Sequence, residues 1–313
     1  MSDWYRDPEL VENLKRLHEL GEAVCGIPDR HPARVALVVS EETLSHFSSQ
    51  PARAFQELRN AAQDFNCWGT PCDILCEADL EDTDFGQYQL VIFANAAYAS
   101  DETIRLTRER VMRDGRTVLF LHALGLVGPD NAIHPGRSKA FTGIGLKASP
   151  EGVFTEVHFQ PGNSPYMKTA PIEFQTVIDD QEAEVVATYP DGQPAGAAKR
   201  FADHTSLVLC HPAPNAAFMR NLLSRTGIHI HERENTYHHY FFTGPLVGIY
   251  SRKQSRSVLS FPQTYEVIGD VFTGKVLARN ADRVEIDLPD EPATTILFTG
   301  TQDEWEGVKP RIK

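Results

Sequence analysis

The sequence contains no apolar run that approaches the length of a membrane span, so an integral membrane protein is not expected. Basic residues are scarce relative to acidic ones: 30 Lys and Arg stand against 43 Asp and Glu, a formal net charge of −13. Because binding to a phosphate backbone requires clustered positive charge, we do not expect nucleic acid as a partner. The first residues also lack a basic segment followed by an apolar one, so no signal peptide is expected.

Cysteine is sparse as well, with five residues at irregular spacing. An odd count without a repeating pattern argues against a disulfide framework and indicates a reducing compartment, which we take to be the cytoplasm. Cys72 and Cys76 lie on one predicted strand, about 13 Å apart at roughly 3.3 Å per residue, too far to share one metal ion. The sequence therefore predicts free thiols and no cysteine metal site.

The stretch from Gly115 to Gly128 lacks a nucleophile where an α/β scaffold would carry one. Val118 to Leu121 is an unbroken apolar run, typical of a strand buried on both faces of a parallel sheet. In such folds the chemistry lies on the following loop, and a nucleophile elbow places Ser or Cys at the turn. That loop is His122-Ala-Leu-Gly125, which has neither. We therefore predict a scaffold with an empty elbow and no catalytic residue.

Apolar strands alternate with amphipathic helices along the first two thirds of the 313 residues, after an initial helix that Asp7 caps. This order predicts a doubly wound, flavodoxin-like α/β domain over residues 31–235, preceded by a helix and linker at 1–30. One of its helices is expected to begin at Pro51. Residues 131–189 are rich in Gly and Pro, and we expect an irregular β insertion there. Short strand patterns at 236–313 predict a small all-β sandwich.

Several short motifs, taken in their order along the chain, resemble family 42 glycoside hydrolases, the bacterial β-galactosidases. They are Asp7-Pro-Glu-Leu10, Ala36-Leu-Val-Val-Ser-Glu-Glu42, Gly196 to Lys199, Ser206 to Cys210, Ala213-Pro-Asn215, Gly227-Ile-His-Ile230, Val271-Phe-Thr-Gly-Lys-Val276 and Ile286-Asp-Leu-Pro289. The resemblance implies that family's trimerisation domain, with a fold like class I glutamine amidotransferases, followed by its small C-terminal β domain. It also implies a homotrimer, or a partner polypeptide that carries the catalytic barrel.

The resemblance does not bring catalytic residues with it. The family's two catalytic glutamates lie on an upstream (β/α)8 barrel, and about 30 residues before the first strand cannot hold a domain of roughly 250 residues. The amidotransferase triad has no Ser or Cys to start from in the loop at His122. We therefore expect a non-catalytic accessory and oligomerisation unit in carbohydrate metabolism, without cofactors.

Two alternatives remain open. The first is a hydrolase whose pocket lies at the carboxyl ends of the α/β strands, with Asn95, Tyr98 and His122 at its rim. For these residues ordinary loop hydrogen bonding is the simpler interpretation. The second is a sugar-binding module in the β domain, where Tyr237 and Tyr240 would stack on a ligand.

The other polar groups in the sequence do not predict a functional site. His229 and His231 share one face of a predicted strand but lack a third ligand, so no metal site is expected. The acidic segment 77–84 and the acid pairs Glu41-Glu42 and Asp179-Asp180 are expected to be solvated, because a glycosidase needs two carboxyls facing each other across a bond.

Overall fold

The computed structural model describes residues 7–46, 65–94, 96–122, 125–130, 132–148, 156–159, 167–168, 176–211, 214–234, 238–289 and 292–309. It divides into two compact units. The β unit comprises residues 1–32, 66–71 and 229–313, and the α/β unit comprises residues 33–65 and 72–228. No helix in the described part of the chain is long and apolar enough to cross a membrane.

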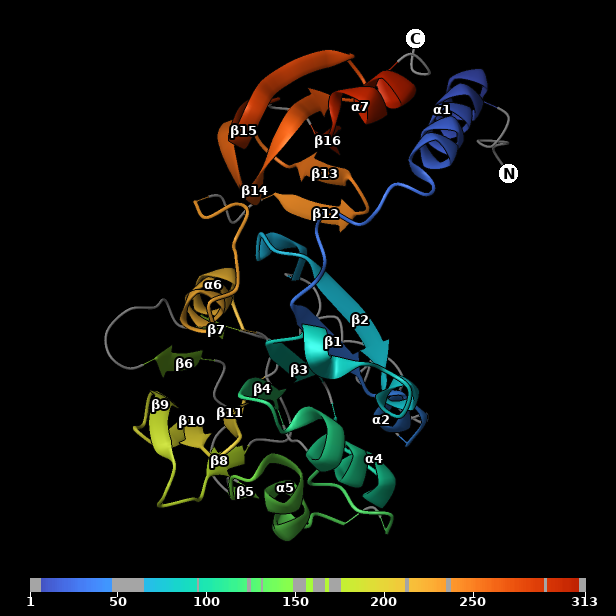
Figure 1. The fold of residues 1–313 in the computed structure, drawn as a ribbon. Coiled ribbons are helices and arrows are strands. Elements are labelled where there is room, and N and C mark those ends of the chain that lie inside the picture. Colours follow the sequence, from blue (N-terminus) through green and yellow to red (C-terminus); the bar gives the residue numbers. More distant parts are fainter. Residues whose placement is uncertain are drawn as a thin grey trace. The chain divides into compact units, whose positions relative to one another are not determined.

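The α/β unit is built on a nine-stranded sheet with the order β2-β1-β3-β4-β11-β10-β9-β6-β7 (Figure 1). The parallel strands are β2 (Cys72–Cys76), β1 (Val35–Val39), β3 (Leu90–Ala94), β4 (Arg116–Leu121) and β11 (His204–Leu209). Antiparallel strands continue the sheet as β10 (Pro194–Arg200), β9 (Glu184–Thr188), β6 (Glu156–Phe159) and β7 (Met167–Lys168). The apolar runs of β1, β3 and β4 are buried as predicted, because layers of structure cover both faces.

The helices of the α/β unit are α2 (Glu41–His46), α4 (Asp101–Leu106), α5 (Pro135–Thr142) and α6 (Ala216–Arg225). Shorter turns are η2 (Phe65–Cys67), which spans the boundary of the two units, η3 (Glu77–Leu80) and η4 (Phe85–Gln87); α4 continues as one π-helical stretch, η5 (Thr107–Val111). Ser100 caps α4 by accepting a hydrogen bond from the Thr103 amide. The helix expected from Pro51 lies largely outside the described residues.

Helix α5 corrects the expectation of an irregular β insertion at 131–189. Strands β5 (Leu146–Ala148) and β8 (Thr176–Ile178) do form a small antiparallel pair there. The helix, however, starts with Pro135 in its first turn and ends at Gly143, whose φ is 79°. Pro and Gly are common in loops, but Pro is also favoured in the first turn of a helix and Gly just after its last turn.

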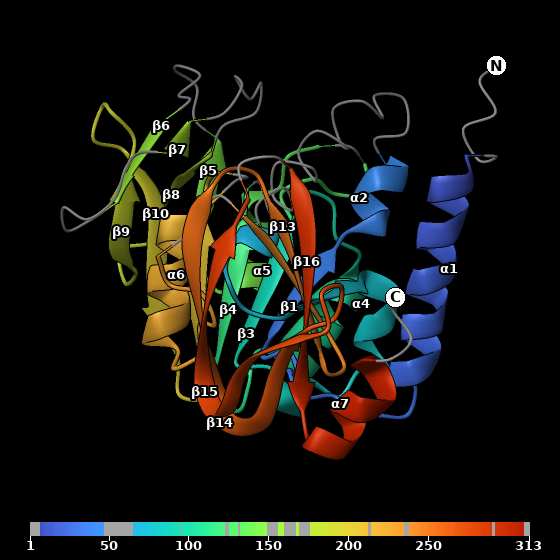
Figure 2. The ribbon, with the colours of Figure 1, turned by 90° about the horizontal axis from the view of Figure 1, so that it is seen from above.

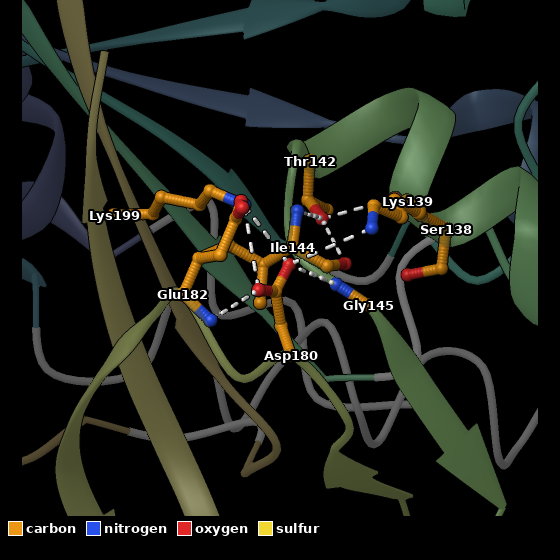
Figure 3. Close-up of polar contacts among 8 residues, drawn as sticks. All are labelled: Ser138, Lys139, Thr142, Ile144, Gly145, Asp180, Glu182 and Lys199. Atoms are coloured by element: carbon orange, nitrogen blue, oxygen red, sulfur yellow. Dashed lines mark hydrogen bonds and ion pairs between the residues drawn. The ribbon is translucent and has the colours of Figure 1, made fainter.

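An ion-pair cluster around the Asp180 carboxylate ties this region together (Figure 3). The Asp180 carboxylate accepts hydrogen bonds from the amides of Gly145 and Glu182, and from Lys199 Nζ at 3.2 Å. Lys199 Nζ also lies 2.8 Å from Glu182 Oε2. With its side chain 3% exposed, Asp180 is not a solvated loop acid, and that expectation was wrong.

The β unit contains one five-stranded antiparallel sheet, with the order β12-β13-β16-β14-β15. Its strands are β12 (His239–Thr243), β13 (Leu246–Ser251), β14 (Ser255–Asp270), β15 (Lys275–Leu288) and β16 (Ala293–Gly300). The expected sandwich needs two sheets. The strongly curved β14–β15 hairpin instead lets one sheet enclose a core that draws on all five strands (Figure 1). Its pairing shifts register between Ser260 and Tyr265, a bulge of the kind that bends strands.

Two helices complete the β unit, α1 (Pro8–Val24) and α7 (Gln302–Val308). Helix α1 agrees with the prediction, and Asp7 caps it by accepting hydrogen bonds from the Glu9 and Leu10 amides. Helix α7 was not predicted; a capping box of Thr301 and Glu304 begins it.

The segment 66–71 makes its hydrogen bonds inside the β unit although the α/β unit flanks it in sequence. Gly69 O accepts the His231 amide at 2.7 Å, and Thr70 Oγ1 donates to His229 O at 2.9 Å. Gly69 has φ 73°, and a Cβ there would lie 2.4 Å from Glu232 O. Only glycine fits this close backbone contact.

Candidate functional site

The strand order places the candidate site at the carboxyl ends of β1 and β3. From β1 the chain moves to β2 on one side of the sheet, and later to β3 on the other. In open α/β sheets ligands bind in the crevice outside the strand ends where the order reverses in this way. The residues that follow β1 and β3 therefore decide whether a ligand can enter.

Helix α2, directly after β1, is hydrogen-bonded to the segment that follows β3. Thr43 Oγ1 accepts the Tyr98 amide at 3.1 Å and donates to Tyr98 O at 3.0 Å. Ser40 Oγ in turn donates to Thr43 Oγ1 at 2.8 Å. The His46 ring stacks on the Tyr98 ring, with centroids 4.2 Å apart and an interplanar angle of 10°. Side chains of the chain itself thus bridge the two sides of the switch point.

Glu42 adds a third tie between α2 and the start of α4. Its Oε2 accepts hydrogen bonds from the Ser100 amide at 2.8 Å and from Thr103 Oγ1 at 3.2 Å. The carboxylate is therefore engaged in positioning α4, and the expectation of a merely solvated Glu41-Glu42 pair was wrong for Glu42. In this arrangement the carboxylate links α2 to the start of α4.

Glu77, directly after β2, is a buried carboxyl, so the expectation of a solvated acidic segment at 77–84 was wrong for this residue. It is 6% exposed, and its Oε2 accepts the Glu42 amide at 3.1 Å. Burial raises the pKa of Glu77 to about 7; the nearby carboxylates of Glu42 and Glu41 add to the rise, and the Ser40 hydroxyl and Glu42 amide oppose it. The apolar Leu75 before it and Leu80 after it were the available sign that this end of the acidic segment is covered.

Glu77→Gln is expected to change how stability depends on pH. The folded pKa of Glu77 lies above the unfolded value of 4.5. Its contribution to the free energy of unfolding is therefore fully present below pH 4.5 and is lost as the pH rises through 7. At pH 8.5 the variant should unfold with a free energy about 2–3 kcal/mol higher than the unaltered chain, and at pH 4 the gain should vanish. Urea unfolding at both pH values measures this. Glu81→Gln, an exposed change in the same segment, is the control, and an equal gain at both pH values would contradict the assignment.

The predicted pocket residues are only partly brought together. Tyr98 belongs to the α2 network, and Asn95 lies outside the described residues. His122 is 4% exposed and has φ 58°, with its amide donating to Leu209 O at 2.7 Å. A left-handed residue directly after a central strand is the backbone geometry of an elbow, here with an imidazole in place of a nucleophile.

The described residues offer no metal centre, because no three of their His, Cys, Asp or Glu side chains are grouped closely enough to hold an ion. The five cysteines are free thiols. Two surface cavities lie away from the switch point. One, of about 450 Å³, is lined by Asp82, Asp84, Arg110, Arg113, Asp114 and Arg116 among others. The other, of about 590 Å³, lies between α4 and α5.

Neither of the two tyrosines expected to stack on a sugar is seen at the surface of the β unit. Tyr240 is 2% exposed, and its hydroxyl lies 3.2 Å from Ser257 Oγ inside the core, so its ring cannot stack on a ligand from solvent. Tyr237 lies outside the described residues. Tyr240 lies on the inward face of β12, and the exposed aromatic side chain of that strand is its neighbour Phe241.

No protein-family model matches this sequence, and no curated protein is similar to it in sequence. Solved structures do match, and several β-galactosidases are among them. The enzyme from Bacillus circulans sp. alkalophilus superposes with a TM-score of 0.63 at 16% identity, over 91% of this chain and 44% of its own. The enzyme from Halorubrum lacusprofundi gives 0.62 at 16% identity, over 87% and 40%.

A third structure, Gan42B, is a GH42 β-galactosidase from G. stearothermophilus, with a TM-score of 0.56 at 17% identity over 85% of this chain and 40% of its own. The chain therefore has the fold of one part of these enzymes and spans about two fifths of their length. The described residues form no (β/α)8 barrel, so the shared part is not a catalytic barrel.

Proposed function

We propose that this chain is a non-catalytic accessory and oligomerisation unit related to β-galactosidase, acting in carbohydrate metabolism. The similarity to part of each β-galactosidase supports this, as does the bridged switch point with its empty elbow. The strand order β2-β1-β3-β4-β11 supports a flavodoxin-like assignment for the α/β unit. Five free thiols support a reducing location such as the cytoplasm.

The observation that carries the proposal is the apolar stripe of α1. Leu20 is buried against α7 and the sheet, and Ala23, Val24 and Ile27 are partly buried against the same cluster. Toward the amino terminus the stripe is exposed: Leu14 and Leu17 are 57% and 45% exposed, and Val11, one turn before Leu14, is 50% exposed. Figure 2 shows this end of α1 extending away from α7. An amphipathic helix gains its stability by burying such a stripe, so α1 needs a further contact.

The proposed contact is another copy of the chain in a homotrimer, or a polypeptide that carries a glycoside hydrolase barrel. Light scattering after size exclusion measures the first directly. The chain has a mass of 35.0 kDa, and a stable particle near three times that mass is the expected result. A monomer that also fails to bind a barrel-bearing β-galactosidase polypeptide would overturn the proposal.

Leu14→Glu tests whether α1 supplies the contact. Because Leu14 is already exposed, the change should leave the unfolding midpoint of the monomer nearly unchanged while weakening assembly by about 2 kcal/mol or more, roughly thirtyfold. Lys15→Glu is the matched control one position away, on the polar side of the helix. If both variants assemble like the unaltered chain, α1 is not the contact.

A hydrolase that uses the edge near His122 and Tyr98 has less support, because α2 and the Tyr98 segment already hydrogen-bond across it. Turnover of a glycoside or ester by the purified chain, lost in His122→Ala, would favour that alternative.

A further inference from the structure

The cavity between α4 and α5 is a recess of about 590 Å³ within the α/β unit. Small-molecule sites commonly have volumes of about 300–1,000 Å³, so the recess is large enough for a compact ligand. One wall is a side of the helix formed by α4 and η5, where lining residues recur at intervals of three and four: Asp101, Ile104, Arg105 and Arg108. The other wall belongs to α5, with Arg137 and Ala140. The chemistry of these two walls defines what the recess can hold.

Two of the three arginines in the recess are already paired with acids. Arg137 Nη1 lies 2.7 Å from Asp101 Oδ1. Arg105 donates to both carboxylate oxygens of Glu102, at 2.8 and 2.6 Å, and pairs with Glu109 as well. Neither of these guanidinium groups therefore has an unmatched charge to offer a ligand.

Arg108 is the third arginine of the recess, and it has no hydrogen-bond or ion-pair partner among the described residues. It is exposed, in a chain whose net charge is −13. A guanidinium group presents a planar fork of donors that matches the two oxygens of a carboxylate. Asp101 and Glu109 also line the recess, so a doubly charged phosphate would meet two neighbouring carboxylates. The unpaired charge of Arg108 therefore suits a single carboxylate.

A π-helical stretch carries Arg108. In η5 the Met112 amide donates to Thr107 O, five residues before it, at 2.9 Å. Helical turns of this kind are rare and are frequently found at functional sites. In the described part of the chain η5 is the only such stretch, and it contains the unpaired arginine. The backbone and the charge pattern thus point to the same residue by independent observations.

We propose that the recess between α4 and α5 binds a small organic acid that has one carboxylate on an apolar body. Arg108 pairs with the carboxylate, and Ile104 and Ala140, one on each wall, contact the apolar body. The class of ligand follows from these side chains, because the recess joins one unpaired guanidinium to an apolar surface. The inference goes beyond the assembly role, since it uses none of the exposed residues of α1.

Saturation-transfer NMR on the intact chain tests the proposal, with phenylacetate as the probe and phenylacetamide as its neutral counterpart. We expect transfer to the aromatic protons of the acid, and the amide should bind at least about tenfold more weakly because it cannot form the charged pair. Arg108→Gln should weaken binding of the acid by about tenfold or more. Ala140→Trp should also weaken it, by filling the recess while Arg108 remains. Arg225→Gln is the matched control, since Arg225 is an exposed arginine at the end of α6 that does not line the recess.

Three results would overturn the proposal. One is the absence of transfer to phenylacetate, and another is equal binding of phenylacetate and phenylacetamide. The third is equal binding of the acid by Arg108→Gln and Arg225→Gln. Thermal unfolding of each variant verifies that it is folded, as expected for exposed positions. Binding of the acid and particle mass are separate readouts, so failure here is distinguishable from failure of the assembly role.

Discussion

Arg116→Met is expected to lower the free energy of unfolding of the α/β unit by about 4 kcal/mol. Arg116 begins β4 and is 3% exposed, a rare position for a charged side chain. Its guanidinium donates to the carbonyl oxygens of Tyr88, Phe85, Arg110 and Val111 at 2.6 to 3.2 Å. Methionine keeps much of the volume but leaves these acceptors without their charged donor.

Arg113→Met is the matched control, because Arg113 is more than half exposed and pairs with its neighbour Asp114. An exposed pair of this kind contributes less than about 1 kcal/mol. Arg116→Lys should fall between the two, since an ammonium cannot reach carbonyls arranged around a planar fork. Chemical unfolding followed by circular dichroism gives the three values. Equal losses for Arg116→Met and Arg113→Met would show that the carbonyl contacts do not stabilise the fold.

Acid is expected to destabilise the β unit through buried histidines. His31 is 4% exposed, lies 5.5 Å from the His231 ring, and accepts or donates a hydrogen bond with Thr299 Oγ1 at 2.8 Å. Burial, with a smaller effect of the Arg30 charge, lowers the pKa of His31 to about 4. Burial lowers the pKa of His231 well below its usual value too.

The direction of this pH effect on stability follows from proton binding. Between about pH 6.5 and 4 the unfolded chain binds the His31 proton and the folded chain does not, so the free energy of unfolding falls as the pH falls through this window. His31 alone should account for about 3 kcal/mol of that loss. Trp68 and Trp305 both lie in the β unit, so tryptophan fluorescence reports its unfolding in urea at pH 7.5 and at pH 4.5.

His31→Phe should remove this part of the acid sensitivity. The site is already aromatic, with the rings of Phe261 and Tyr265 within 6 Å, and Thr299 Oγ1 keeps its hydrogen bond to Pro245 O. His18→Gln, an exposed change on α1, is the control and should leave the acid loss as it is. An unchanged acid loss in His31→Phe would mean that other groups set the pH dependence.

The elements that local chemistry specifies were predictable from the sequence. The run from Val118 to Leu121 is buried in a parallel strand because no polar side chain interrupts it. Asp7 caps α1 because a carboxylate followed by proline satisfies the first amides of a helix. Scattered motifs suggested a likeness to β-galactosidases, and the structure of one such enzyme matches 91% of the chain.

The face of a strand and the burial of a polar residue were harder to predict. Tyr240 and Phe241 are adjacent, so a shift of one residue decides which ring meets solvent, and an apolar run such as that of β12 does not fix the choice. Glu77 and Asp180 lie in acidic segments, where the default is exposure. Their burial depends on the Glu42 amide and on Lys199, groups that lie 35 and 19 residues away in the sequence.

The chain passes between its two units four times, at residues 32–33, 65–66, 71–72 and 228–229. A single genetic breakpoint therefore cannot transfer either unit to another protein. A gene cut after residue 228 would encode Gly69 and Thr70 without the backbone of residues 229–232 that they contact. We expect recombination to move the two units together as one heritable block, and limited proteolysis at one site to leave both attached.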